Sequence, residues 1–525
     1  MTPQVTRTLI GAIRLSVVIA LCVVVPVFAV SAEAIDRRPV DIELFDVRSV
    51  VPADWQDLGT GTFTRGTPPD DPTVIVLQSA AASVAEIWPM LLPQLARTDI
   101  PEATGSRSTG AFDWTLYAMD VELPDLTVAI ELALAEEGGR TFLVLMQSDA
   151  DESDVLREQV FLPALDEFRE LEPEPTPDPA TLGYSVEEVA FDGGSDDLRL
   201  AGTLTLPPGP GPHPVVILLT GSGPQDRDES LKPATTLKPF AVIADALTRA
   251  GVGVLRYDDR GVGGSTGDYE AATVTDLTAD ARAALDYVVS REDVDADRIG
   301  ILGHSEGGLY AATLAADDRR VAFVVAMAPP AVDGVSLLAA QREAIARSSG
   351  QPDEEIEATM ALSEKLLPLV LAGDEDGARA VLDDAIGAFW DRQADDVRAV
   401  LGDRDAFVEL QLEAQLPTYT SDWFRSFLAS DPATDWSRVA IPALGLFGAL
   451  DVQVPLEQNE PAWTAALVAA RNADATAIVF DDANHLFQAA ETGAVGEYPT
   501  LEPEFTPDFL PALVEWVTAQ VGVDD

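Results

Sequence analysis

From about residue 183 to the end of the chain, short apolar runs alternate with longer segments whose apolar residues recur at helical spacing. An apolar run of about four to eight residues between polar turns is typical of a strand buried on both faces. The alternation of such strands with helices predicts a mostly parallel sheet with helices on both faces, which is an α/β fold. We predict strands at 215–219, 252–257, 299–303, 321–327, 443–447 and 477–480. We predict helices at 238–250, 275–290, 306–316 and 462–470.

Residues 35–170 have a different pattern. The segments 126–134 and 141–146 alternate polar and apolar residues around a Glu-Glu-Gly-Gly turn, which predicts a β-hairpin. The segment 155–171 has apolar residues at helical spacing. We predict a small accessory α+β domain, built from two strand-then-helix units that would be tandem repeats. The repeats are indicated by a weak sequence similarity, in which 76–79 resembles 145–148 and 92–95 resembles 162–165.

A proline-rich, acidic segment separates the two patterns. Residues 170–180 contain four prolines and four acids in eleven positions. Such a segment cannot continue a helix or a central strand, and it is typical of a stiff, extended linker. We therefore predict a linker at 171–182, between the accessory domain and a second domain at 183–525.

More than 100 residues separate the predicted strands 321–327 and 443–447, where a plain connection needs only a handful. Helical spacing at 378–389 and 395–401 predicts an inserted helical cap at about 332–438. A cap over the strand ends would wall a pocket and exclude water from it. Its aromatic side chains would line that pocket or form only the cap's own core. These aromatic residues are Trp390, Phe407, Trp423, Phe424 and Phe427.

The first 32 residues have the layout of a secretory signal peptide. Arg7 and Arg14 precede an uncharged run at 15–30, and small residues follow it. The run is too short for a membrane anchor, so we expect cleavage, no membrane span in the mature chain and an extracytoplasmic location. The only cysteine, Cys22, lies inside this segment, and a cleaved chain could therefore form no disulfide and use no thiol.

The charge balance is strongly acidic. The chain has 33 Lys and Arg residues against 89 Asp and Glu, a net charge of −56, and removal of 1–32 would leave −58. Such a surface repels phosphate groups, which disfavours nucleic acid, acyl-CoA and anionic lipid as partners. Only three of the basic residues are lysine. We predict adaptation to high salt, where screening weakens self-repulsion; an acidic secreted protein without that adaptation is the alternative.

The pattern Gly-x-Ser-x-Gly occurs twice, at 263–267 and 303–307. The first copy follows a polar loop, and no helix follows it directly. The second copy lies between a predicted strand and a predicted helix, the setting of a nucleophile elbow. We therefore predict that Ser305 is a nucleophile and that Ser265 lies in an ordinary loop.

A serine nucleophile needs a general base, and the sequence has only three histidines. His213 lies between two prolines and His304 is inside the elbow, which leaves His485, just after the last predicted strand. The acid that orients the base should follow the preceding strand, where Asp451 lies. It would fix the imidazole tautomer and stabilise the imidazolium.

An oxyanion intermediate needs two main-chain N–H donors. We predict that Glu306, the residue after the nucleophile, supplies one through its backbone, and we give its side chain no catalytic role. The second donor should lie in the small-residue loop after strand 215–219, where we favour Ser222 and then Gly223.

These segments belong to five motifs that resemble those of the bacterial α/β-hydrolase carboxylesterases with a helical lid, a group related to serine aminopeptidases and dienelactone hydrolases. The resemblance covers 184–525 and leaves 35–170 uncovered. It implies the α/β-hydrolase fold, ester hydrolysis and a Ser305–Asp451–His485 triad. The motifs are Gly-Ser-Gly-Pro-Gln-Asp-Arg-Asp at 221–228, Arg-Tyr-Asp-Asp-Arg-Gly-Val-Gly at 256–263, Gly-His-Ser-Glu-Gly at 303–307, Asp-Val-Gln-Val-Pro at 451–455 and Asn-His-Leu-Phe-Gln at 484–488.

Within these motifs, Asp226, Asp228 and Arg260 are expected to brace loops. We predict an exported serine hydrolase that cleaves small-molecule carboxylic esters through an acyl-enzyme. A serine aminopeptidase is one alternative, since a chain with 89 acids can supply a carboxylate for a substrate ammonium. A binding protein on an inactive hydrolase fold is the alternative of another class. No sequence feature indicates a metal or an organic cofactor.

Overall fold

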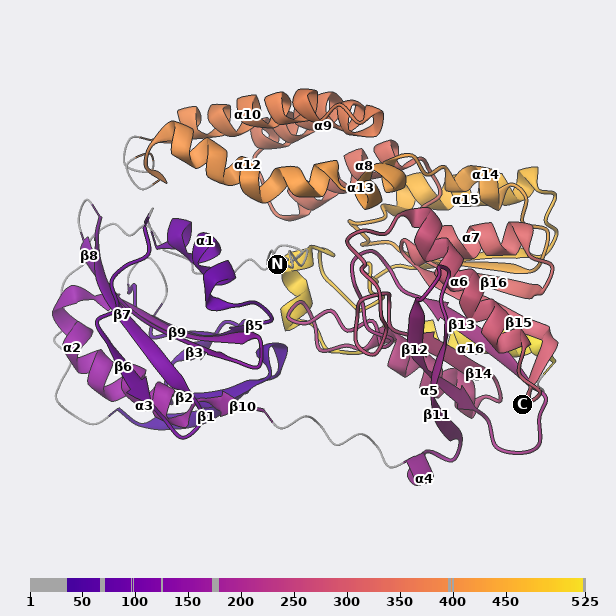
Figure 1. Cartoon of the computed structure of the whole chain (residues 1–525), viewed down its shortest axis with the longest axis horizontal. Helices are drawn as coiled ribbons and strands as arrows, with labels where there is room; N and C mark the ends of the chain where they lie inside the picture. Colours follow the sequence, from indigo (N-terminus) through magenta and orange to yellow (C-terminus); the bar gives the residue numbers. More distant parts are fainter. Residues whose placement is uncertain are drawn as a thin grey trace. The chain divides into compact units, whose positions relative to one another are not determined.

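A computed structural model describes most of the chain after the first 34 residues (Figure 1). The predicted signal peptide lies outside the described residues, and so does most of the predicted linker. Contacts divide the described residues into two compact units, 35–171 with 387–409, and 179–386 with 410–522. The described residues are 35–66, 71–95, 97, 99–123, 126–171, 179–394, 398 and 401–522.

The N-terminal unit is built on antiparallel sheets. Seven strands pair in the order β3-β4-β5-β9-β8-β7-β6, and a smaller sheet has the order β1-β2-β10. The predicted hairpin is confirmed, since β8 and β9 pair antiparallel from Val128 and Asp149 up to Glu137 and Arg140. The strands are β1 (Arg37–Ile42), β2 (Val47–Pro52), β3 (Gln56–Asp57), β4 (Thr62–Thr64), β5 (Val74–Ala80), β6 (Gly105–Ser108), β7 (Asp113–Leu123), β8 (Leu126–Glu137), β9 (Arg140–Asp149) and β10 (Arg169–Glu170).

Both strand-then-helix units predicted for this region are present. Strand β5 leads into α1 (Val84–Gln94), and β9 leads into a helical segment that contains a π-helical turn. The two strands pair antiparallel within the larger sheet. The helical segment consists of α2 (Ser153–Leu156), η3 (Arg157–Phe161) and α3 (Leu162–Glu167). Its buried side chains join those of the strands in one apolar core, which includes Phe142, Val160, Phe161 and Leu165.

The second unit contains an eight-stranded sheet with the order β11-β12-β14-β13-β15-β16-β17-β18. Strand β12 pairs antiparallel with both of its neighbours, and the strands from β14 to β18 in this order are parallel. All six predicted strands are present, and two antiparallel strands precede them that the sequence did not predict. The strands are β11 (Ser185–Asp192), β12 (Arg199–Leu206), β13 (His213–Leu219), β14 (Gly253–Tyr257), β15 (Val294–His304), β16 (Val321–Met327), β17 (Ala443–Gly448) and β18 (Ala475–Phe480).

Helices cover both faces of this sheet. On β13, Val216 and Leu218 belong to the apolar cluster shared with α5 and α16, whereas Ile217, which points to the opposite face, does not. The four predicted helices are confirmed, and α16 was not predicted. The bounds are α5 (Pro239–Arg249), α6 (Val274–Val289), α7 (Gly307–Asp317), α15 (Leu456–Ala469) and α16 (Phe509–Val521). The predicted α/β-hydrolase architecture, preceded by a small α+β unit, is therefore confirmed.

A helical insertion separates β16 from β17, as the sequence predicted (Figure 1, orange). The predicted helix 378–389 lies within α10, and most of the predicted helix 395–401 lies outside the described residues. None of the described helices is both long enough and apolar enough to cross a bilayer. The inserted helices are α8 (Gly334–Ser348), α9 (Asp353–Ala372), α10 (Glu375–Arg392), α12 (Arg404–Thr420), α13 (Asp422–Leu428) and α14 (Pro432–Trp436).

Candidate active site

Ser305 lies in the sharp turn between β15 and α7. Its φ of 51° is left-handed, a conformation that costs a residue with a side chain about 1–3 kcal/mol. Hydrogen bonds hold the strained turn: the Ser305 amide donates to Met327 O on β16 (2.9 Å), and Gly308 donates to Ser305 O (2.8 Å). Ser305 is the one residue of 301–312 that is not buried. The elbow therefore presents its hydroxyl to solvent at the carboxyl end of a central strand.

Two glycines allow this turn to close. A Cβ atom on Gly303 would collide with the carbonyl oxygen of Gly307, and one on Gly307 would collide with the carbonyl oxygen of Leu219 at the end of β13. No side chain fits at either position without a shift of the main chain. The glycines of the predicted elbow are therefore needed for close packing of backbone on backbone.

His485 and Asp451 lie in the loops that follow β18 and β17, and both are buried. The Nδ1 atom of His485 is 2.8 Å from Asp451 Oδ2. The other oxygen, Oδ1, accepts from the amides of Gln453 (2.7 Å) and Val454 (2.8 Å). Because a carboxylate can only accept, the imidazole proton lies on Nδ1 and Nε2 is left as the basic nitrogen.

The three predicted triad residues are only partly in direct contact. Asp451 and His485 are hydrogen-bonded, whereas no hydrogen bond joins the Ser305 hydroxyl to His485 among the described residues. The neighbour of Ser305, His304, does contact the base loop, since its Nε2 is 3.1 Å from the carbonyl oxygen of His485. The two imidazole rings lie 4.8 Å apart. Catalytic hydrogen bonds are often loose without substrate, so this geometry is compatible with a triad.

The loop after β13 lies against Ser305, because a Cβ built on Gly221 would be 3.2 Å from the Ser305 Cβ. The amides on either side of Ser222 have acceptors: Gly221 donates to Glu229 Oε1 (3.0 Å) and Gly223 to the Tyr269 hydroxyl (2.9 Å). Among the described residues, the Ser222 amide has no acceptor within the protein. This arrangement favours Ser222 over Gly223 as a donor.

The side chain of Glu306 is buried beside the elbow, which the sequence did not indicate. Its Oε1 accepts a hydrogen bond from the indole Nε1 of Trp423 in α13 (3.0 Å). Burial raises the pKa of Glu306 to about 7, although the hydrogen bond from Trp423 lowers it in part. Like Ser222, the Glu306 amide has no acceptor among the described residues.

The predicted cap aromatics have different surroundings. Trp423 reaches the elbow through Glu306 and stacks on Phe427, with ring centroids 5.8 Å apart. Phe424 is buried within the cap. Earlier in the insertion, Phe407 stacks on Phe389, and the guanidinium of Arg398 lies over the ring of Trp390. Of the five residues, only Trp423 is hydrogen-bonded to a residue of the predicted site.

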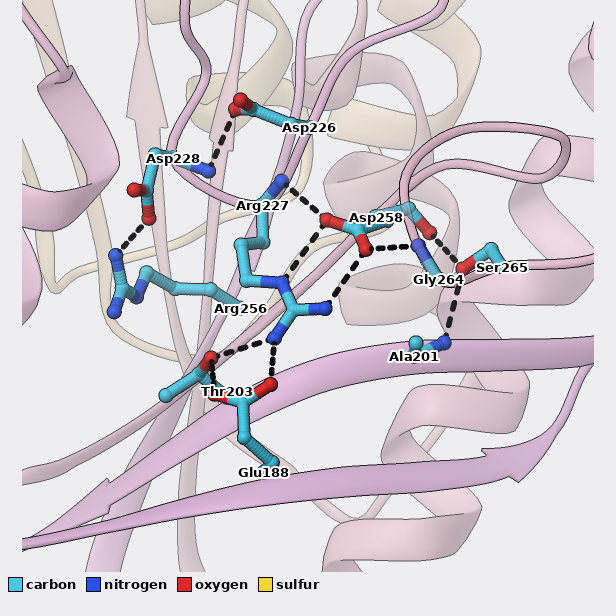
Figure 2. Close-up of polar contacts among 10 residues, drawn as sticks. All are labelled: Glu188, Ala201, Thr203, Asp226, Arg227, Asp228, Arg256, Asp258, Gly264 and Ser265. Atoms are coloured by element: carbon cyan, nitrogen blue, oxygen red, sulfur yellow. Dashed lines mark hydrogen bonds and ion pairs between the residues drawn. The ribbon is translucent and has the colours of Figure 1, made fainter. Parts of the chain in front are cut away.

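A network of charged residues braces the loops that flank the site (Figure 2). Arg227 makes a two-pronged contact with Asp258, at 3.0 Å from Nε and 2.8 Å from Nη2, and a third contact with Glu188. Asp226 accepts from the Asp228 amide, and Asp228 pairs with Arg256. The predicted bracing roles of Asp226 and Asp228 thus match these contacts.

Ser265, the serine of the other Gly-x-Ser-x-Gly segment, belongs to this network (Figure 2). The Ser265 hydroxyl donates to the Asp258 carbonyl oxygen (2.7 Å) and accepts from the Ala201 amide (2.9 Å). Arg260, in the same loop, forms a buried ion pair with Asp280 of α6 at 2.7 Å. Ser265 therefore connects a loop to β12, as expected for an ordinary loop serine.

A hollow of about 590 Å³ lies where α13 and α14 meet α6 and α7. Leu309, Thr313 and Asp435 are among its lining residues. The lining does not include Ser305, Asp451 or His485, so this hollow is separate from the predicted triad.

Comparison with known proteins agrees with this architecture. Residues 235–359, which include the elbow, match the serine aminopeptidase S33 family. The chain is 26% identical over 414 residues to esterase EstD of Thermotoga maritima, a match that covers 79% of this chain and 82% of EstD. The aligned length exceeds that of residues 183–525, so the match includes part of the preceding region.

Shorter matches exist as well. The hydrolase YtaP of Bacillus subtilis, described as putative, is 37% identical over 129 residues, which cover 22% of this chain and 43% of YtaP. A solved esterase structure from Pyrococcus furiosus superposes with a TM-score of 0.38 at 17% identity, covering 66% of this chain and 95% of that one. The chain therefore has an α/β-hydrolase fold and is similar to esterases and to the serine aminopeptidase family, in agreement with the resemblance of its motifs.

Proposed function

We propose that the protein is a serine carboxylesterase in which Ser305, His485 and Asp451 form the catalytic triad. The observation that carries the proposal is the buried Asp451–His485 hydrogen bond of 2.8 Å next to the strained Ser305 turn. The similarity to EstD supports ester hydrolysis in particular.

The reaction follows from the roles of these groups. Ser305 Oγ bonds to the ester carbonyl carbon while its proton passes to His485 Nε2. The tetrahedral intermediate then expels the alkoxy group, which leaves as an alcohol with that proton. A water molecule next gives a proton to His485 Nε2 and bonds to the acyl carbon. When this second intermediate collapses, the carboxylic acid is released and Ser305 Oγ recovers its proton.

Two amides are suited to the negative charge that develops on the carbonyl oxygen. Neither the Ser222 amide in the loop nor the Glu306 amide in the elbow has a protein acceptor among the described residues. We assign them to the oxyanion hole, in agreement with the sequence expectation for Ser222 and Glu306. Such donors contribute most when they are fixed before the reaction, and here the elbow is fixed by its packing against β13.

Labelling with a fluorophosphonate probe tests the nucleophile. We expect one covalent adduct on the wild-type protein, mapped by peptide mass spectrometry to Ser305. The Ser265→Ala variant should still be labelled, and Ser305→Ala should not. An unlabelled but folded wild-type protein would favour a binding protein on an inactive fold.

A substrate screen separates the esterase from the aminopeptidase suggested by the family match. The screen compares p-nitrophenyl esters of graded chain length with aminoacyl-p-nitroanilides. We expect turnover of the esters and little or none of the anilides. Faster cleavage of the anilides would replace the carboxylesterase assignment with a peptidase.

We also propose that the protein is exported, because residues 1–32 have the layout of a signal peptide. The full chain and a chain that begins at Glu33 would be expressed in a bacterial host and fractionated. The full chain should appear outside the cytoplasm with a new N-terminus close to residue 33. Recovery of both forms in the cytoplasm with their original N-termini would argue against export.

Adaptation to high salt is the third part of the proposal, and it is supported by the net charge of −56. Salt screens repulsion that is stronger in the compact state than in the unfolded chain, so the melting temperature should rise with NaCl and KCl. A further gain above about 1 M would indicate preferential hydration or cation binding. A flat or falling melting temperature would argue against this adaptation.

A further inference from the structure

A second histidine–carboxylate pair lies behind the predicted triad. His304, the last residue of β15, and Glu229, in the loop before α5, are both buried, at 2% and 0% exposure. The Nδ1 atom of His304 is 2.8 Å from Glu229 Oε1. The same oxygen accepts the Gly221 amide at 3.0 Å. On the other side of the ring, His304 Nε2 is 3.1 Å from the carbonyl oxygen of His485.

The partners of His304 determine how many protons its ring carries. A carbonyl oxygen has no proton to donate, and an ionised carboxylate has none either. An imidazole that hydrogen-bonds to both must therefore donate from both nitrogens, as only the imidazolium can. A neutral ring could form one of these bonds and would direct a lone pair at the other acceptor.

The electrostatic balance points the same way. Burial lowers the pKa of His304, but the charge and the hydrogen bond of Glu229, the hydrogen bond to the His485 carbonyl and the charge of Asp451 together raise it more, so that it lies above its ordinary value. A buried ion pair whose members are also hydrogen-bonded to the main chain is the arrangement in which such charges are tolerated.

The pair connects three segments that the proposed reaction needs. His304 precedes the nucleophile, its Nε2 holds the main chain of His485, and Glu229 holds the loop next to Ser222. We propose that His304 is a buried imidazolium paired with Glu229 and acts as a positioning residue, which fixes the base loop and the oxyanion loop to the strand that carries Ser305. The kinetic part of this proposal rests on the proposed triad, whereas the charge state of His304 does not.

The charge state can be measured on the wild-type protein. The chain has only three histidines, so ¹⁵N labelling of histidine gives three imidazole signal sets. His213→Gln and His485→Gln identify two of them and leave His304 by difference, without any change to the pair itself. At pH 7 we expect both ring nitrogens of His304 to have imidazolium chemical shifts. A shift typical of an unprotonated nitrogen at either position would overturn the proposal.

The positioning role is tested with Glu229→Gln. The Gln side chain can still accept from Gly221 and from a neutral His304, but the neutral ring loses its bond to His485. Because small displacements of catalytic groups can cost up to about 10²-fold, we expect kcat for an ester to fall about 10- to 100-fold while KM stays within about twofold. An unchanged kcat in a folded Glu229→Gln variant would overturn the role.

Asp280→Asn provides the matched control, since it also neutralises the acid of a buried ion pair, here with Arg260. It should lower the melting temperature and leave kcat at 25 °C within about twofold. If Glu229→Gln does not fold, the chemical shifts of the wild-type protein still decide the charge state. If the wild-type protein hydrolyses no ester, the proposed function fails, and the same spectrum still tests the ion pair.

Discussion

The segments 263–267 and 303–307 share the pattern Gly-x-Ser-x-Gly, but their serines have different backbones and different partners. Ser305 has a left-handed φ and no hydrogen bond to its hydroxyl among the described residues. Ser265 has no such strain, and its hydroxyl forms two hydrogen bonds to main-chain groups. One serine is held in strain with a free hydroxyl, and the other uses its hydroxyl to join β12 to the loop after β14.

The glycines of the two segments are also required for different structural reasons. Gly307 has no room for a side chain because β13 lies against it. Gly267 instead has a φ of 100°, a conformation that residues with side chains rarely adopt. Gly263 and Gly267 thus have positive φ values, whereas Gly303 and Gly307 do not and are required by the backbone packed against them. The element that precedes the pattern, a buried strand or a polar loop, decides which structure forms.

Ser305→Ala should have the largest effect. With no nucleophile, kcat for an ester should fall about 10⁶-fold, the scale seen when a serine hydrolase loses its nucleophile. The melting temperature should change little, because the hydroxyl has no protein hydrogen bond to lose. Ester turnover and thermal melting check the two parts.

Ser305→Gly sharpens the same test. Glycine adopts a left-handed φ without strain, so this variant should be equally inactive but more stable than Ser305→Ala by roughly 1 kcal/mol. Comparable activity losses in Ser305→Ala and Ser265→Ala would show that the nucleophile is misassigned.

Asp451→Asn should cause the second-largest loss of ester turnover. Asn can donate to His485 Nδ1, which favours the tautomer with its proton on Nε2, where a base is needed. We expect kcat to fall about 10⁴-fold, as in the corresponding change of a known triad, with little change in KM. A loss of less than about tenfold would mean that Asp451 does not orient the base.

Arg227→Met should break the network around the Ser265 loop. It leaves Asp258, whose side chain is 4% exposed, without its charged partner. Loss of one partner of a buried pair costs about 3–5 kcal/mol, so the free energy of unfolding should fall by about 3 kcal/mol. Urea melts at pH 7 measure this loss.

The stability that Arg227→Met loses should be smaller at low pH than at neutral pH. Burial raises the pKa of Asp258. The hydrogen bonds and charge of Arg227 and the hydrogen bond of the Gly264 amide lower it by more, so the pKa lies below its ordinary value. The stabilisation is therefore present above about pH 4 and lost below it as Asp258 is protonated. The difference between wild type and Arg227→Met should narrow in acid. A constant difference from pH 3 to 7 would contradict this explanation.

Much of the second unit could be predicted from the sequence, because its parallel strands are apolar on both faces and stand out as short runs. Strand β11 was missed because most of its residues are exposed and it contains Glu187 and Glu188. Strand β12 was missed because it is interrupted by polar residues such as Thr203 and Thr205. An exposed edge strand such as β11 and a strand interrupted by polar residues such as β12 both leave a weaker signal than an unbroken apolar run.

In the candidate site, position in the fold located Ser305, Asp451 and His485, since each follows a predicted strand. The contacts of Glu229, Tyr269 and Trp423 were not predictable. Their partners are 8, 46 and 117 residues away in sequence, and no motif marks such pairs. The burial of Glu306 was missed because a carboxylate at a helix N-terminus is usually exposed, whereas here the cap covers it.

Glu306→Gln should remove a pH-dependent loss of folding stability that the buried Glu306 carboxyl causes. With a pKa near 7 in the folded protein and about 4.5 in the unfolded chain, Glu306 keeps its proton longer when folded. Its contribution to stability therefore falls as pH rises from about 4.5 to 7, by on the order of 2–3 kcal/mol. Gln keeps the acceptor for Trp423 without this titration.

The stability of Glu306→Gln relative to wild type should thus increase over that pH window and stay constant above about pH 8. Thermal or urea melts at pH 5, 6, 7 and 8 measure it. Equal pH dependence of the two proteins would show that Glu306 titrates normally and that the cap does not seal it from water.

Ser265→Ala should have the smallest effect, and it acts on stability and not on turnover. The change leaves the Ala201 amide without its acceptor and the Asp258 carbonyl oxygen without one donor, and a lost hydrogen bond of this kind costs about 0.5–1.5 kcal/mol. The free energy of unfolding should therefore fall by about 1–2 kcal/mol, while kcat and KM for an ester stay within about twofold of wild type. Ser265→Thr is the matched control, because it keeps the hydroxyl and adds one methyl group. A large fall in kcat for Ser265→Ala without loss of stability would mean that the loop after β14 takes part in the reaction, and that the two segments are less different than their hydrogen bonds indicate.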